Sequence, residues 1–186
     1  SGAVYIYKRS GATWAQEAYI KASNNDANDI FGNSLSLDGD TLSVGAYREA
    51  SNQTTITNGD TSSADNSNGT SGAVYIYKRS GATWAQEAYI KASNNDVNDR
   101  FGNSLSLDGD TLSVGAYGED SNQTTITNGN TSSADNSNTQ SGAVYIYKRS
   151  GTTWAQEAYI KASNNDASDN FGNSLSLDGD TLSVGA

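Results

Sequence analysis

Hydrophobic and polar residues alternate with a period of two in four short stretches of the sequence. Leu105 and Leu107 alternate with serines, and Leu112 and Val114 fall on one side of the next stretch. A period of two is typical of a β-strand with one buried face, and no segment shows the helical period. We therefore predict four antiparallel strands. Their expected ranges are 101–107, 111–116, 143–148 and 153–161.

The connections between these strands differ strongly in length. Asp108-Gly109 and Ser150-Gly151 predict tight hairpin turns, because both dipeptides tolerate positive φ. Residues 117–140 contain almost no large hydrophobic residue and predict a long polar loop. One unit is thus two hairpins joined by one long loop.

The whole pattern repeats every 70 residues. The segment that begins at Ser1 begins again at Ser71 and at Ser141. Four-stranded units in tandem favour an all-β, β-propeller-like array of antiparallel blades, whereas the coils of a β-solenoid are usually much shorter. The strands suffice for three blades, one of them split between the termini. The expected units are a half blade at 1–23, blades at 24–93 and 94–163, and a half blade at 164–186.

The split blade predicts self-association. The stretch 3–8 would be the third strand of a blade, and the stretch 181–186 would be the second strand. An unpaired sheet edge is a template for pairing. We expect 181–186 of one chain to pair with 3–8 of the next, in a head-to-tail ring or filament. The alternative is a lone three-bladed ring closed within one chain.

Charge and composition exclude several classes of partner and chemistry. The net charge of −10 disfavours nucleic acid as a partner. There is no cysteine for disulfides or thiolate metal sites and no histidine for the commonest general base. No apolar run approaches the roughly 20 residues that span a bilayer, so we expect no membrane insertion.

Two dipeptides recur in register with the strands. Phe-Gly stands at 31–32, 101–102 and 171–172, and Gly-Ala follows at 45–46, 115–116 and 185–186. The chain resembles the FG-GAP repeats of bacterial surface proteins and of the integrin α-chain propeller. This resemblance implies a β-propeller, usually extracellular, used for recognition or adhesion. The family's calcium loop is shortened here to Asp38-Gly39-Asp40, which supplies too few oxygens for calcium and fits a hairpin turn.

A second acidic segment precedes each Phe-Gly. Carboxylate and amide oxygens at alternating loop positions suit a hard cation such as calcium. They equally suit a solvated turn, in which Asn and Asp bond their own backbone. The candidate calcium ligands are Asp26, Asn28, Asp29, Asp96, Asn98, Asp99, Asp166 and Asp169.

Aromatic residues also recur in every unit. Aromatic faces bind sugar rings in many lectins, but large flat side chains are equally needed for packing between blades. The candidate ligand-binding residues are Trp14, Tyr19, Trp84, Tyr89, Trp154 and Tyr159.

The near-identity of the units disfavours catalysis, because an active site is normally one asymmetric constellation. We expect no enzyme. The leading hypothesis is a structural and adhesive module, secreted or on the surface of a bacterial cell, that binds itself or cell-surface proteins. The alternative is a multivalent glycan-binding propeller.

Overall fold

The regular structure of the chain consists of antiparallel β-sheets joined by loops. The computed structural model describes residues 2–186, which form fourteen strands and contain no helix that could cross a membrane. The strands are β1 (Val4–Ser10), β2 (Thr13–Ile20), β3 (Ser34–Asp38), β4 (Thr41–Ala46), β5 (Thr57–Asn58), β6 (Ala73–Ser80), β7 (Thr83–Ile90), β8 (Ser104–Asp108), β9 (Thr111–Ala116), β10 (Thr127–Asn128), β11 (Ala143–Ser150), β12 (Thr153–Ile160), β13 (Ser174–Asp178) and β14 (Thr181–Gly185).

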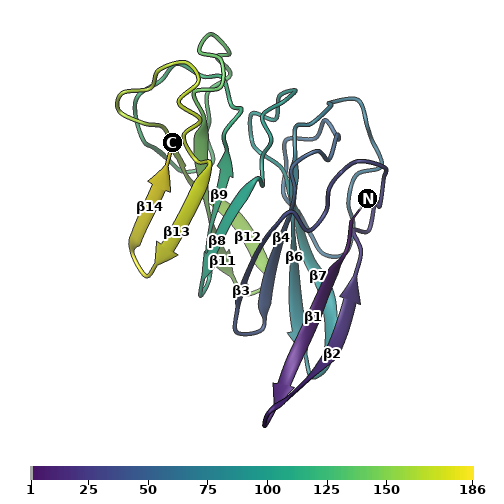
Figure 1. Cartoon of the computed structure of the whole chain (residues 1–186). Helices are drawn as coiled ribbons and strands as arrows, with labels where there is room; N and C mark the ends of the chain where they lie inside the picture. The colour runs from purple at the N-terminus through teal and green to yellow at the C-terminus, as the bar shows by residue number, and fades with distance from the viewer. Residues whose placement is uncertain (1) are drawn as a thin grey trace.

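These strands form two complete blades and two half blades. Blade one has the order β3-β4-β6-β7-β5, and blade two has the order β8-β9-β11-β12-β10. The pairs β1-β2 and β13-β14 form the N-terminal and C-terminal half blades. Figure 1 shows these four sheets in a row, with the purple N-terminal hairpin and the yellow C-terminal hairpin at opposite ends. The predicted all-β, propeller-type repeat of four-stranded blades is confirmed.

Three details differ from the predicted blade. The inner strand β8 begins at Ser104, three residues later than predicted. Phe101 lies outside this strand and forms an isolated parallel bridge with Gly72. The tight turn consists of Gly109 and Asp110, with Gly109 at a φ of 56°. Each long loop also contributes a two-residue strand, β5 or β10, to the outer edge of its blade.

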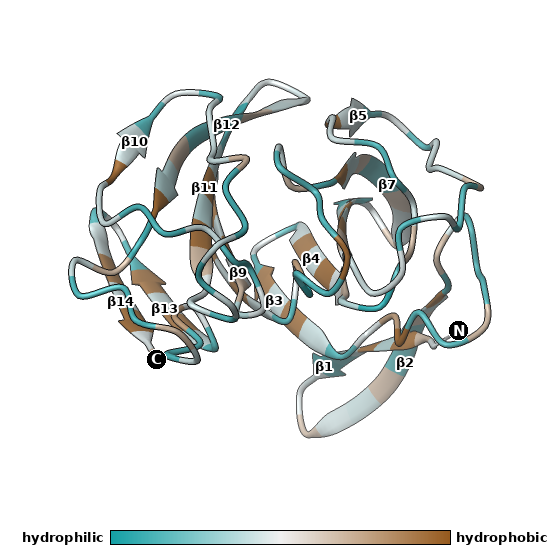
Figure 2. Ribbon diagram, turned by 90° about the horizontal axis from the view of Figure 1, so that it is seen from above, coloured by the Kyte–Doolittle hydropathy of each residue, from teal (hydrophilic) through white to brown (hydrophobic). Residues whose placement is uncertain are grey.

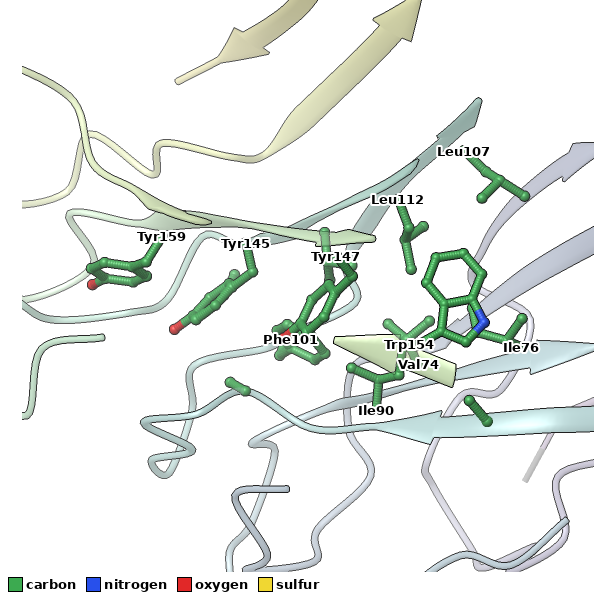
Figure 3. Packing of buried hydrophobic residues seen from close by; sticks show 14 of the residues in the cluster. Val74, Ile76, Ile90, Phe101, Leu107, Leu112, Tyr145, Tyr147, Trp154 and Tyr159 are labelled. Carbon is green, nitrogen blue, oxygen red and sulfur yellow. The ribbon is translucent and has the colours of Figure 1, made fainter. Parts of the chain in front are cut away.

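The two faces of a blade differ in chemistry. In blade two the aromatic face contains Tyr145, Tyr147, Trp154 and Tyr159, and in blade one the aliphatic face contains Val74, Ile76, Ala88 and Ile90. These two faces pack on each other, with Phe101 in the same cluster. Figure 3 shows Trp154 beside Ile76 and the ring of Tyr147 beside that of Phe101. The core therefore lies between neighbouring blades.

The same packing recurs at both ends of the row. The aromatic face of blade one packs on Val4 and Ile20 of the N-terminal half blade. The aliphatic face of blade two packs on Leu175 and Leu182 of the C-terminal half blade. Hydrophobic residues are concentrated on the strands, and the connecting loops are mostly hydrophilic (Figure 2). Every blade thus has one face for the blade before it and the other for the blade after it.

The split blade is not closed within one chain. Strands β1 and β14 lie in separate two-stranded sheets, so neither has its expected neighbour. The lone three-bladed ring considered from the sequence is therefore not the structure that the chain adopts.

Candidate interaction surfaces

The acidic segment of each unit forms a turn held by its own backbone. Asp29 accepts a hydrogen bond at Oδ2 from the Asp26 backbone N–H at 3.2 Å, and Asp99 accepts one from Asp96 at 3.0 Å. Asp169 accepts the same bond from Asp166 at 3.1 Å. Such bonds are typical of Asx-type turns.

The tip of each turn lies in the left-handed region of backbone conformation. Asn28 and Asn98 have φ values of 72° and 71°, and Ser168 takes the same position at 68°. Asn tolerates this conformation better than most residues, because its short polar side chain bonds locally. The Asn side chains predicted as calcium ligands thus stand at positions that the turn itself requires.

Burial changes the acidity of the last aspartate of the turn. Asp99 is 2% exposed, and desolvation raises its pKa to about 8, although the Asp96 N–H opposes the shift. Nearby Glu119 raises the pKa further. Desolvation also raises the pKa of Asp29, which is 3% exposed. A buried carboxyl of this kind is held more easily as the neutral acid.

The first asparagine of the segment joins one unit to the next blade. Asn24 donates from Nδ2 to Glu49 Oε1 at 3.1 Å and to the Ser63 carbonyl at 2.8 Å. Its Oδ1 accepts the hydroxyl proton of Tyr75. Asn94 makes the equivalent contacts with Glu119 and Tyr145. The acidic segment is therefore a contact between blades.

Among residues 2–186, no three acidic side chains are grouped so that they could hold a metal ion. Asp26 and Asp96 have protein donors instead, because their Oδ2 atoms accept from Asn66 and Asn136. The sequence left a solvated turn and a calcium site both open; with these bonds in place we expect the turn, and thermal unfolding with and without calcium tests calcium binding.

A buried ion pair joins the long loop of each complete blade to the residue that follows its fourth long strand. Lys91 Nζ lies 2.8 Å from Glu49 Oε2 and 2.9 Å from Ser71 Oγ. In blade two, Lys161 Nζ lies 2.6 Å from Glu119 Oε2. All four charged side chains are 0% or 1% exposed. Sequence reasoning missed this pair, although the 70-residue recurrence of a glutamate inside a polar loop was a usable signal.

The six aromatic candidates have different environments. Tyr89 and Tyr159 are fully buried, so their ring faces are not available to a ligand. Their hydroxyl groups form hydrogen bonds with the hydroxyl groups of Ser51 and Ser121. Trp154 is 2% exposed, and Trp84 is half-buried. Only Trp14 and Tyr19 are exposed. For the buried tyrosines this burial favours the packing role, which the sequence left open beside ligand binding.

Trp84 and Trp154 are each held by a glutamate of the preceding blade or half blade. Trp154 donates from Nε1 to Glu87 at 3.1 Å, and Arg149 Nε lies 2.7 Å from the same carboxylate. Trp84 donates to Glu17 in the same way. The repeated aromatic and acidic residues therefore pair with each other across the boundary between blades.

One polar cavity opens between the long loop of blade one and strand β12. Its volume is about 330 Å³, and its wall includes Thr54, Asn58, Asn130, Trp154 and Gln156. The amide and hydroxyl groups of this wall are suited to binding a hydrated polar ligand such as a sugar.

The blades, their alternating faces and their 70-residue recurrence define a tandem-repeat protein of the β-propeller type. The FG-GAP repeat model matches residues 14–77, 84–147 and 154–186. The chain therefore belongs to the FG-GAP repeat family, whose repeats occur in extracellular and adhesion proteins. The search of curated proteins finds no match.

Proposed function

We propose that the chain is an extracellular structural and adhesive repeat module and has no catalytic role. The observation that carries this proposal is that the recurring charged and aromatic side chains of the complete blades are engaged with one another, both between blades and within a blade. Glu87 holds Trp154 and Arg149, and Glu119 holds Lys161. Identical copies of a contact suit a stack that bears load or binds at several points. The partners that we propose for this module are cell-surface proteins and other copies of the chain.

Adhesion can be measured with beads coated with the folded chain and held in shear flow over intact cells. Beads coated with the heat-unfolded chain control for charge and surface density. We expect the folded chain to retain beads, and treatment of the cells with protease to release them. Equal retention of beads with folded and unfolded chain would overturn the proposal.

A glycan-binding function is the second candidate, and the polar cavity beside Trp154 favours it. Asn130 is exposed at the rim of this cavity, whereas Asn136 lies outside its wall. On a glycan array, sugar binding that is lost in Asn130→Ala and kept in Asn136→Ala would support this function. In the bead assay, release by glycosidase rather than protease would support it as well.

A further inference from the structure

The two ends of the row carry complementary halves of one blade. In both complete blades the second strand pairs with the third, β4 with β6 and β9 with β11. Strands β14 and β1 repeat these sequences but have no such neighbour. We propose that the N-terminal half blade of a second copy docks on β14 and completes a four-stranded blade, head to tail. This inference rests on the proposed structural function, for which it names the partner and the surface.

The register of the proposed pairing follows from the two blades that contain it. Thr41 lies opposite Lys78 and Ala46 opposite Ala73, and the β9-β11 pair has the same register. The same register places Thr181 opposite Lys8 of the second copy. A sheet edge with unpaired backbone groups favours such strand addition.

The N-terminal half blade has an uncovered aromatic face. Tyr5, Tyr7, Trp14 and Tyr19 are 55%, 56%, 65% and 52% exposed. Their counterparts in blade two are between 0% and 2% exposed, because the aliphatic face of blade one covers them. Four exposed aromatic side chains on one hairpin form a large apolar patch for a monomer.

The opposite end of the row has the surface that covers such a face. The aliphatic face of blade two includes Ile146 and Ile160, and the half blade β13-β14 covers only part of it. A groove of about 260 Å³ lies between them, lined by Ile146, Glu157, Ile160 and Leu182 among others. In the boundary between the complete blades, the position beside Ile76 is occupied by Trp154 (Figure 3). By the same spacing, this groove receives Trp14 of the second copy.

In the part of the chain that the structure describes, the carboxylate of Glu157, at the groove, has neither the tryptophan nor the arginine that its counterparts Glu17 and Glu87 bind. Glu17 and Glu87 each bind a tryptophan and an arginine of the next blade, and their side chains are 8% and 9% exposed. Glu157 is the third member of this series and is exposed. Docking places Trp14 and Arg9 of the second copy beside it. An opposite charge and an indole donor at a partly buried carboxylate favour one orientation of the partner.

The backbone at the end of β14 is shaped for a neighbour as well. A Cβ at Gly45 would lie 2.1 Å from the Gly102 carbonyl oxygen, and one at Gly115 would lie 2.0 Å from that of Gly172. At Gly185, within the described residues, the atoms that a Cβ would meet all belong to Ser174, the nearest being its hydroxyl at 2.3 Å, which can rotate. The glycine at 185 thus keeps open the space that Gly32 of the second copy would enter.

The inference is tested by the mass of the chain in solution and by two variants. Gly185→Ala blocks the tail, β13-β14, and Tyr5→Ser/Tyr7→Ser removes part of the aromatic head. Light scattering from 1 to 100 μM is expected to show that the 19.5 kDa chain associates. Each variant should weaken association at least about 100-fold, as for a central interface residue. Circular dichroism of dilute samples should show unchanged folding, since all three substituted positions lie at uncovered ends.

A mixture of the two variants distinguishes head-to-tail docking from other contacts. The Gly185→Ala chain keeps a normal head, and the double tyrosine variant keeps a normal tail. We expect the mixture to give a 1:1 complex that grows no further, because each chain has one blocked end. A wild-type chain that stays monomeric at 100 μM, or variants that associate as the wild type does, would overturn the inference.

Failure here is separate from failure of the proposed function. A monomer that still retains beads on cells would remove the second copy as the partner and leave the adhesive module. A chain that assembles but retains no beads would keep the second copy as the partner and remove the adhesive function.

Discussion

Lys91 and Glu49 form an ion pair at 2.8 Å between two side chains that are 0% and 1% exposed. Desolvation lowers the pKa of Lys91, and the Glu49 carboxylate counters that shift. Glu49 belongs to the long loop and Lys91 follows β7, so the pair fixes the loop on its blade. In the N-terminal half blade the equivalent Lys21 donates to the Gly2 carbonyl at 2.7 Å instead.

Breaking the pair on one side should destabilise the fold strongly. In Glu49→Gln the buried ammonium of Lys91 loses its counter-charge, and we expect a loss of about 3 kcal/mol of unfolding free energy, measured in urea. The double variant Glu49→Gln/Lys91→Met should recover part of that loss, because no unpaired charge remains. Glu157→Gln is the control, since Glu157 is exposed in the single chain. A Glu49→Gln chain as stable as this control would show that the pair is not a structural tie.

The raised pKa of Asp99 should make the stability of the fold depend on pH. Its pKa is about 8 in the folded chain and about 3.9 when unfolded, so the folded chain binds more protons between these values. Stability from this group is therefore present below about pH 4 and is lost as the pH rises through about 8. The raised pKa of Asp29 acts in the same direction. Hydrogen bonds from Ser67 and Ser137 lower the pKa of Asp65 and Asp135, so the stability they supply is lost on acidification.

We therefore expect a higher Tm at pH 5 than at pH 8.5. Asp99→Asn should raise the Tm at pH 8.5 by about 3 °C, on the order of 1 kcal/mol, and should flatten the slope between pH 5 and 8.5. Asp169→Asn is the matched control, because Asp169 is only half-buried in the C-terminal unit. An Asp99→Asn chain with the slope of the wild type would contradict the assignment.

Calcium should leave the Tm unchanged. The Asp29 carboxylate already accepts the Asp26 N–H, and the Asp26 carboxylate already accepts from Asn66. Differential scanning calorimetry in millimolar calcium and in excess chelator measures the effect directly. A Tm that rises in calcium, and no longer does so in Asp26→Asn, would establish a calcium site in these turns.

The sequence predicted the strands and the repeat well because period-two patterning is local. It gave no packing role to the long loops, which it predicted only as long and polar. Glu49 and Ser51 are in fact buried there, and Lys91, the ion-pair partner of Glu49, lies 42 residues away in sequence. The sequence likewise left open whether the aromatic residues face a ligand or a neighbour, because burial depends on which blade covers them. Only the arrangement in space separates exposed Tyr19 from buried Tyr89.

The last prediction concerns the hairpins at the inner edge of the row. Asp38 accepts at Oδ2 from the Gly109 N–H at 2.8 Å, and Asp108 accepts from Gly179 at 2.7 Å. Each carboxylate thus joins its own hairpin to that of the next blade. Asp178 is the third of the series, and among residues 2–186 no backbone N–H of a further hairpin is bonded to it. The three aspartates are therefore matched by sequence and differ in whether a neighbour is present.

Asp38→Ala and Asp108→Ala should each lower the Tm of the dilute chain by about 2 °C, through loss of one charge-assisted hydrogen bond. Asp178→Ala should leave that Tm unchanged. At 100 μM the order should change, because head-to-tail docking would bring Gly39 of a second copy to Asp178, and Asp178→Ala should then weaken association. Equal effects of all three substitutions on the dilute chain would show that these carboxylates act within their own turns rather than between blades.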